Sequence, residues 1–252
     1  MGFGYDGAWA EYVAVPGTAL AEVPEHVPIE QAAILADAVA TPYAALTDRG
    51  ALRPGQSVGL WGIGGLGVHA VQIARMAGAA PIIAVDPSKA ARVRALDRGA
   101  DVALDPGGTD VVADVLRLSD GGLDLAVDLV GANAVLTEAA ACLGRFGRVV
   151  MVGLSMDPLQ LGPGVVLGMR SQSVLGHLGY QKRHLDDLVK LVGAGRLELS
   201  RSISGTLPLD DVAAGVRRLA TKENDPIRLV VTPLSDRLDV SVETSAATGA
   251  PR

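Results

Sequence analysis

The chain has 252 residues, a formal net charge of −6 and a mean hydropathy of +0.32. With 49% hydrophobic and 20% charged residues, it has the composition of a globular protein rather than a disordered one. No apolar run approaches the ~20 residues that a membrane-spanning helix needs. The acidic balance also disfavours a nucleic-acid-binding surface, because phosphate contacts require clustered Lys and Arg. We therefore expect a cytoplasmic protein that binds neither membranes nor nucleic acids.

Two extended segments and one Ala-rich helix are expected near the N-terminus. Residues 8–15 alternate apolar and polar side chains, as a strand does, with Trp9 in the core. Residues 20–24 form a second extended piece. Residues 29–46 predict a helix that is interrupted at Thr41–Pro42, because the residue before a proline avoids the helical region.

The middle of the chain alternates short apolar strands with helices. This alternation predicts right-handed βαβ crossovers and a parallel sheet, with Trp61 in its core. The expected strands are 58–61, 81–86, 102–104, 123–130, 148–153 and 174–177, and the expected helices are 68–77, 89–98, 111–118, 134–143 and 185–192. A further helix begins after Pro208, with Asp210 or Asp211 as its N-cap, and a last strand covers 228–231. The tail from 235 to 252 lacks an apolar period, and we expect it to be disordered.

A glycine-rich turn follows the first strand of this alternation. The segment Gly62–Gly67 has the spacing G-x-G-x-x-G, with a strand before it and a helix after it. Gly62 permits the tight turn, Gly64 lets the backbone approach a pyrophosphate, and Gly67 lets the helix pack on the strand. The turn therefore predicts a dinucleotide site with the pyrophosphate at the helix N-terminus.

An acidic residue ends the next strand, about 20 residues after the turn. The Asp86 carboxylate is placed to accept hydrogen bonds from the adenosine ribose and to repel a 2′-phosphate, which favours NAD(H) over NADP(H). Lys89 and Arg92 follow it and leave NADP(H) open. Asp86 also has the position of a helix N-cap. Asp124 and Asp128 share one face of the fourth strand, and we expect them to form strand-end hydrogen bonds rather than an acid–base pair.

These motifs resemble the medium-chain dehydrogenase/reductase family, which includes the zinc-type alcohol dehydrogenases. The resemblance runs from about residue 7 to 232. Besides the glycine turn, the matching segments are 7–13, 30–35, 41–46, 53–58, 144–153 and 207–212. It implies a Rossmann-type doubly wound parallel sheet over 48–199, and a remnant of a GroES-like β domain over 1–47 and 200–234. The family's long N-terminal stretch, which carries most of its catalytic domain, has no counterpart in this sequence.

The resemblance also places the site residues. Thr41 matches the position beside the nicotinamide ring, although it also fits a helix-capping role. His177 is the histidine nearest to the chemistry, although a structural role suits it equally. We expect His69 to be a packing residue and both His26 and His184 to lie on the surface. The implied cofactor-binding residues are Gly62, Ile63, Gly64, Gly65, Leu66, Gly67, Asp86, Lys89, Val130, Gly131, Val152, Gly153, Leu154 and Leu175.

Zinc is not expected, despite the resemblance. The chain has one cysteine, Cys142, in an apolar helical stretch, so neither a disulfide nor a Cys-rich zinc site can form within it. We expect Cys142 to be a buried small hydrophobe. Of the family's zinc-ligand positions only one remains, and Asp37 occupies it. One carboxylate without partners is not a metal site.

Three functions fit these motifs. The first is an NAD(H)-dependent oxidoreductase that transfers hydride to or from a small alcohol or carbonyl substrate. The second is a zinc-independent enoyl or quinone reductase, and the third is a catalytically silent NAD-binding protein or a truncated copy of a longer enzyme. The resemblance further implies a homodimer paired through the edge strand at 174–177. The apolar segment 36–46, which the missing domain would cover, is expected to be exposed.

Overall fold

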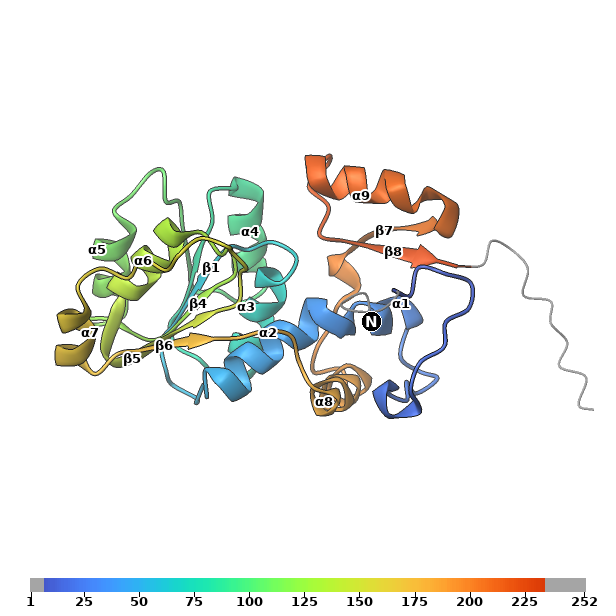
Figure 1. The fold of residues 1–252 in the computed structure, drawn as a ribbon, viewed down its shortest axis with the longest axis horizontal. Helices are drawn as coiled ribbons and strands as arrows, with labels where there is room; N and C mark the ends of the chain where they lie inside the picture. Colours follow the sequence, from blue (N-terminus) through green and yellow to red (C-terminus); the bar gives the residue numbers. More distant parts are fainter. Residues whose placement is uncertain (1–6, 234–252) are drawn as a thin grey trace, which may run out of the picture.

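The computed structural model describes residues 7–233, so the tail expected to be disordered, 235–252, lies outside the described residues. The described chain forms two lobes, one around a large sheet and one around a small sheet (Figure 1). The larger lobe is the middle of the chain. The smaller lobe combines segments from near both ends, which lie side by side although they are far apart in sequence (Figure 1).

The large sheet has six strands in the order β3-β2-β1-β4-β5-β6, all parallel. Its strands are β1 (Val58–Trp61), β2 (Ile82–Val85), β3 (Val102–Leu104), β4 (Leu123–Asp128), β5 (Leu143–Met151) and β6 (Ser173–Gly176). Every residue of β1 and β2 is buried, as expected for central parallel strands covered on both faces. This order reverses between β1 and β4, which confirms the predicted Rossmann-type doubly wound sheet.

Helices cover both faces of this sheet. One core joins it to α3 (Gly67–Met76), α4 (Lys89–Asp97) and helices of the N-terminal segment, and a second core joins it to α5 (Val111–Leu118) and α6 (Asn133–Ala141). Trp61 and Cys142 lie in the second core, at 2% and 0% exposure, as predicted. Burial raises the pKa of the Cys142 thiol to about 12, which leaves it a packing residue.

One helix of the larger lobe was not predicted from the sequence. A short helix, α7 (Gly164–Arg170), precedes β6, and its side chains are exposed or only partly buried. It has no buried apolar stripe, so it lacks the periodic signal on which a helix prediction depends. The next helix, α8 (Lys182–Gly193), follows β6 as predicted and begins three residues earlier than expected.

The N-terminal segment differs from its prediction. Residues 8–15 form no strand, and Trp9 is 65% exposed rather than in the core. A strand is stable only beside a partner that accepts and donates its backbone hydrogen bonds. Within residues 7–233 no strand pairs with this segment. Only a short 3-10 turn, η1 (Gly17–Ala19), follows.

The Ala-rich helix breaks at a different place from the predicted one. It comprises α1 (Ile29–Ala33), η2 (Leu35–Val39), α2 (Ala40–Ala44) and η3 (Ala45–Arg49). The break is at Ala36–Asp37, where Asp37 has a φ of 59°. Pro42 instead lies in the first turn of α2, where the absence of its N–H costs no intrahelical hydrogen bond.

The segment predicted to be an exposed apolar patch, 36–46, is largely buried. Ala38, Val39 and Leu46 are 4%, 0% and 0% exposed, because these helices pack against α3 and α8. The prediction was wrong because the larger lobe itself covers this face. The exposed large apolar side chains of the N-terminal segment lie earlier, at Trp9, Tyr12, Val13, Leu20 and Ile29.

The smaller lobe contains a second sheet. Its elements are η4 (Ser200–Ser202), β7 (Ile203–Pro208), η5 (Leu209–Asp211), α9 (Val212–Thr221) and β8 (Arg228–Thr232), and β7 pairs with β8 in parallel. The sequence predicted β8 and α9 but missed β7, whose Ser, Gly and Thr residues weaken the apolar signal. Asp211 occupies the N-cap position of α9, without a capping hydrogen bond from its side chain.

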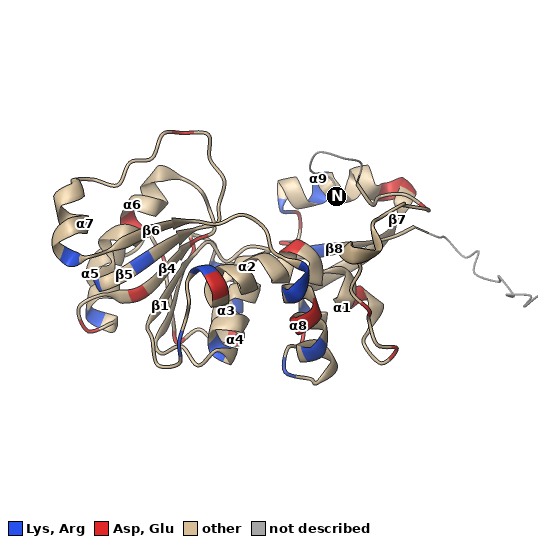
Figure 2. Ribbon diagram, turned by 60° about the horizontal axis from the view of Figure 1, so that its bottom comes forward, with Lys and Arg blue, Asp and Glu red and all other residues tan. Residues whose placement is uncertain are grey.

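Charged residues of both signs are mixed along the helices. Figure 2 shows Lys and Arg beside Asp and Glu on α8, where Lys182 pairs with Asp186 one turn later. None of the helices in residues 7–233 has the length and apolar character that a membrane span requires.

Candidate functional site

The glycine-rich turn joins β1 to α3 at the carboxyl edge of the sheet. Gly62 has a φ of +90°, which only glycine adopts without strain. A Cβ on Gly67 would lie 1.9 Å from the carbonyl oxygen of Gly62, so a side chain there is sterically excluded. A Cβ on Gly64 would meet no atom within 4 Å. Gly62 and Gly67 thus serve the turn itself, whereas Gly64 leaves its backbone open to a ligand.

Asp86 connects the end of β2 to this turn. Its carboxylate accepts hydrogen bonds from the backbone N–H groups of Ile63 and Ser88, both at 2.7 Å. Ser88, not Asp86, caps α4 through its side chain. Arg92 donates to the carbonyl oxygen of Asp86 at 2.8 Å and pairs with Asp105. Lys89 is exposed and does not line the cavities at the turn.

A cavity of about 490 Å³ opens beside the turn. This volume lies within the range of small-molecule and cofactor sites. Its polar lining includes Asp86, Glu138 and Lys222, and Glu138 accepts a hydrogen bond from the Trp61 indole at 2.8 Å. The apolar walls are formed by Trp61, Leu66, Val85, Pro87, Pro106, Leu129, Val130 and Val135. The sequence analysis did not single out Glu138 or Lys222.

A second cavity, of about 220 Å³, lies where β4, β5 and β6 end. Asp128 is 1% exposed there and accepts hydrogen bonds from the N–H groups of Val130 and Gly131 at 2.8 and 3.0 Å. Asp128 therefore forms the strand-end hydrogen bonds that were expected, whereas Asp124 binds Ser57 at the opposite, amino edge of the sheet. Gly131 and Gly153 approach so closely that a Cβ on Gly153 would lie 2.1 Å from the Gly131 nitrogen.

The remaining backbone positions of the predicted site lie at the same edge. Leu154 lines the second cavity and is 70% exposed, whereas Val152 is buried at 7%. Leu175 lies in β6 and pairs with Val150 of β5. The structure thus gathers most of the predicted residues along one edge of the sheet.

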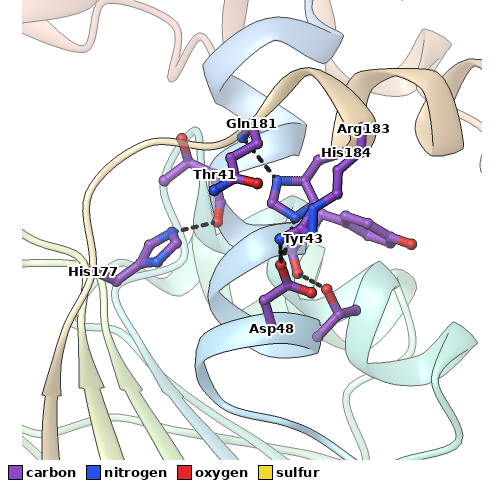
Figure 3. A network of polar contacts seen from close by, with 8 residues as sticks. Thr41, Tyr43, Asp48, His177, Gln181, Arg183 and His184 are labelled. Carbon is purple, nitrogen blue, oxygen red and sulfur yellow. Dashed lines mark hydrogen bonds and ion pairs between the residues drawn. The ribbon is translucent and has the colours of Figure 1, made fainter.

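Thr41 and His177, the two predicted catalytic residues, lie together (Figure 3). The Nε2 atom of His177 donates a hydrogen bond to the carbonyl oxygen of Thr41 at 3.2 Å. The Thr41 hydroxyl donates to Asp37 Oδ1 at 2.8 Å and is therefore a link across the helix break rather than an N-cap. Burial lowers the pKa of His177, and this outweighs the hydrogen bond to Thr41, so the imidazole is neutral at pH 7.

The connection from β6 to α8 carries a second polar network, also seen in Figure 3. His184 accepts a hydrogen bond from the Gln181 N–H at 2.9 Å through Nδ1, and donates through Nε2 to Asp48 at 2.7 Å. Arg183 binds the same carboxylate. His184 is 4% exposed, so the prediction of a surface position was wrong. Its partner is distant in sequence, and no local pattern revealed the contact.

Arg228, at the start of β8, lies beneath the glycine turn. A Cβ on Gly65 would be 2.7 Å from its guanidinium carbon. The Nε and Nη2 atoms are buried and have no hydrogen-bond partner within residues 7–233. Burial lowers the pKa of Arg228, and the Asp37 carboxylate opposes that shift. A guanidinium with two hydrogen-bond donors left free within residues 7–233, beside a phosphate-binding type of turn, is suited to an anionic ligand. Arg228 was not predicted as a site residue from the sequence.

His69 packs behind the turn on α3, as predicted. Its Nδ1 atom donates to the carbonyl oxygens of Ala38 and Gly65, at 3.0 and 2.9 Å. Burial lowers the pKa of His69 to about 4. The neutral ring therefore connects the helix break to the glycine turn. His26 is on the surface, as expected.

The side chains and backbone groups near the turn bear on two kinds of ligand, a metal ion and a dinucleotide. Within residues 7–233 no three His, Cys, Asp or Glu side chains come together as metal ligands, and Asp37 has only the Thr41 hydroxyl as a side-chain partner. These residues do not fit a zinc ion. The open backbone at Gly64, the Arg228 donors left free within residues 7–233 and the adjoining cavity do fit a dinucleotide phosphate.

The fold and this edge of the sheet define a Rossmann-type α/β protein. The zinc-binding dehydrogenase family matches residues 65–194, about half of the chain, so the chain belongs to that family.

Comparisons with individual proteins agree with this family assignment. The chain is 28% identical to an uncharacterized zinc-type alcohol dehydrogenase-like protein of Escherichia coli, over 90% of this chain and 66% of that one. It is 31% identical to an NDMA-dependent alcohol dehydrogenase of Amycolatopsis methanolica, over 91% of this chain and 63% of the relative. A solved NAD-dependent alcohol dehydrogenase superposes with a TM-score of 0.80 at 29% identity, covering 90% and 65% of the two chains. The chain therefore spans less than two thirds of these proteins' length.

Proposed function

We propose that this chain binds NAD(H) and belongs to an oxidoreductase that transfers hydride to or from a small alcohol or carbonyl substrate. The observation that carries the proposal is the glycine turn with Asp86 at the mouth of the 490 Å³ cavity. Similarity to an NDMA-dependent and to an NAD-dependent alcohol dehydrogenase supports the same reaction class. The second cavity, which lies beside His177, offers space for the reacting end of the cofactor.

Each part of the site has a distinct task in this proposal. The Asp86 carboxylate binds the adenosine ribose and disfavours a 2′-phosphate. The backbone at Gly64 and Gly65, with Arg228 beneath it, binds the diphosphate. NAD, when bound, supplies the hydride acceptor. Thr41 and His177 position the reacting groups.

We also propose that the chain comprises two domains with different roles. Residues 48–199 form the dinucleotide-binding domain, and the described parts of 1–47 and 200–234 are the remnant of a catalytic domain. The chain spans less than two thirds of the length of the relatives it matches. Turnover by this chain alone is thus a stricter test than cofactor binding.

The experiment is a calorimetric titration of the purified chain with NADH and with NADPH, followed by turnover assays. The proposal expects NADH to bind more tightly than NADPH and expects oxidation or reduction within a panel of small alcohols and aldehydes. NADH binding without turnover of any alcohol, aldehyde, enoyl or quinone substrate would establish a silent cofactor-binding protein instead. No binding of either dinucleotide contradicts the proposal outright.

A homodimer paired through β6 is the assembly that we propose. β6 is an edge strand of the six-stranded sheet, and neighbouring α7 exposes Val165 and Met169, at 65% and 79%. An exposed edge strand is a template for pairing with a second copy. Light scattering at micromolar concentration should give twice the chain mass, and a monomeric mass would reject the dimer.

A further inference from the structure

The connection from α9 to β8 spans residues 222–227, and its first part, the 222–225 loop, has an unusual backbone. Three of its residues, Lys222, Asn224 and Asp225, have φ values of 54°, 59° and 50° although none is glycine. Such a conformation costs of the order of 1 kcal/mol for most residues, and less for Asn and Asp. Lys222 is the left-handed C-cap of α9, so the end of the helix and the contacts of the loop together set its backbone.

Those contacts fasten the loop to both lobes. Asp225 forms an ion pair with Arg94 of α4, in the larger lobe, where the Arg94 side chain is 22% exposed. On the other side, the Ile227 N–H donates to the Ser204 hydroxyl of β7 at 2.8 Å. The Asp225 N–H closes the loop on the carbonyl oxygen of Lys222 at 2.9 Å. The smaller lobe thus holds this loop against the cofactor side of the larger one.

The backbone of the 222–225 loop places Lys222 at the glycine turn. Lys222 lines the 490 Å³ cavity together with Gly64, Gly65 and Asp86. It also lines an adjoining cavity of about 310 Å³, which it shares with the same turn and with Arg228. Within residues 7–233 Lys222 forms no ion pair. Its charge is therefore available to a ligand that enters either cavity.

We propose that Lys222 binds the phosphates in the adenosine-diphosphate half of the dinucleotide. An ammonium group is a compact cation suited to phosphate oxygens, and Arg228 presents a second cation to the same turn. Because both cations come from the smaller lobe, cofactor affinity depends on that lobe's position. The inference rests on the proposed binding of NAD(H) and adds a residue that specifies the phosphates.

The test compares ligands that differ in phosphate content. ADP-ribose, NADH and adenosine are titrated by calorimetry into the wild-type chain, Lys222→Met and Lys222→Arg, with Lys190→Met as the matched control. Lys190 is an exposed lysine of α8 that lines none of these cavities. For an exposed cation, Lys222→Met is expected to weaken ADP-ribose and NADH about 3- to 10-fold. Adenosine binding, Lys222→Arg and Lys190→Met should remain near wild type.

The outcomes separate this inference from the proposed function. Equal ADP-ribose affinity in Lys222→Met and wild type overturns the role of Lys222 while leaving NAD(H) binding intact. An equal loss of affinity for adenosine overturns it as well. Adenosine has no phosphate, so the side chain would then act through packing rather than through its charge. A wild-type chain that binds neither NADH nor ADP-ribose contradicts the proposed function and this inference together. Melting curves confirm that each variant is folded.

A second measurement tests Asp225 as a positioning residue. If Asp225 acts by placing Lys222, Asp225→Asn should weaken ADP-ribose binding in the wild-type background and have no further effect in Lys222→Met. A purely structural role would lower affinity by the same factor in both backgrounds, and that result would contradict positioning through Lys222.

Discussion

The Asp86 carboxylate accepts a hydrogen bond from the backbone N–H of Ile63 at 2.7 Å, across a sequence separation of 23 residues. This bond ties the end of β2 to the glycine turn at the end of β1. A residue predicted from spacing to bind ribose therefore also shapes the turn that faces the phosphates. Substitutions of Asp86 will act on both parts of the cofactor site.

Asp86→Asn should reverse much of the preference for NADH. The amide keeps one oxygen, so it can accept from only one of the Ile63 and Ser88 N–H groups, and it loses the charge that repels a 2′-phosphate. We expect about a 10-fold weaker affinity for NADH, the scale of one charge-assisted hydrogen bond, together with a gain for NADPH. Fluorescence titration of both cofactors measures the ratio of their affinities. An unchanged ratio would show that Asp86 does not select the cofactor.

Substitution by alanine should lower stability at one glycine of the turn and cofactor affinity at another. Gly67→Ala places a Cβ 1.9 Å from the Gly62 oxygen, and we expect a loss of about 3 kcal/mol or more in the free energy of unfolding. Gly64→Ala meets no atom within 4 Å, so stability should be unchanged while NADH binding falls. Thermal unfolding and NADH titration of both variants test this pair. Equal stability of the two would contradict the steric argument.

Arg228→Met should separate stability from binding. Two buried guanidinium nitrogens have no hydrogen-bond partner within residues 7–233, and an apolar side chain removes the cost of leaving those donors unsatisfied. We expect the free energy of unfolding, measured in urea, to stay equal or rise, while affinity for NADH falls. A destabilised variant with normal NADH affinity would instead show that Arg228 is structural.

Acid should destabilise the protein through His69. Its folded-state pKa of about 4 lies below the ordinary value of 6.5, so the unfolded chain binds the proton first as the pH falls. This contribution to stability is fully present above about pH 6.5 and is lost as the pH falls through 4, amounting to about 3 kcal/mol. His69→Gln, which keeps an N–H donor, should flatten the dependence of unfolding free energy on pH in that window. An unchanged slope in the variant would assign the acid sensitivity to other groups.

The sequence predicted those parts of the fold that local pattern determines. The strands around Trp61 and Asp86 are short, apolar and bounded by turn residues, so their type and order followed from periodicity. The predicted strand with Trp9 in the core was wrong, because a strand needs a partner strand and within residues 7–233 none lies beside it. The break at Asp37 was missed because no glycine marks it. The Thr41 hydroxyl bonds the Asp37 side chain across the break.

The residues of the candidate site also fall into those that the sequence predicted and those that it did not. Asp86, Thr41 and His177 were predicted because motif spacing and family resemblance mark them. Lys222 and Arg228 were not, because each reaches the turn from a separate segment more than a hundred residues along the chain. An isolated cation carries no periodic signal, and only the folded backbone reveals what it approaches.

The smaller lobe is built from segments near both ends of the chain, and this sets an order of folding during synthesis. The Gln31 side chain accepts a hydrogen bond from the Leu199 N–H at 3.0 Å, across 168 residues. When the ribosome has made the helices at 29–49, that partner does not yet exist, and neither do β7 and β8. The larger lobe can close on those helices first, whereas the 222–225 loop is placed only after almost the whole described chain has emerged. A ribosome-bound intermediate that lacks this loop should therefore hold a folded sheet before it acquires full affinity for the cofactor.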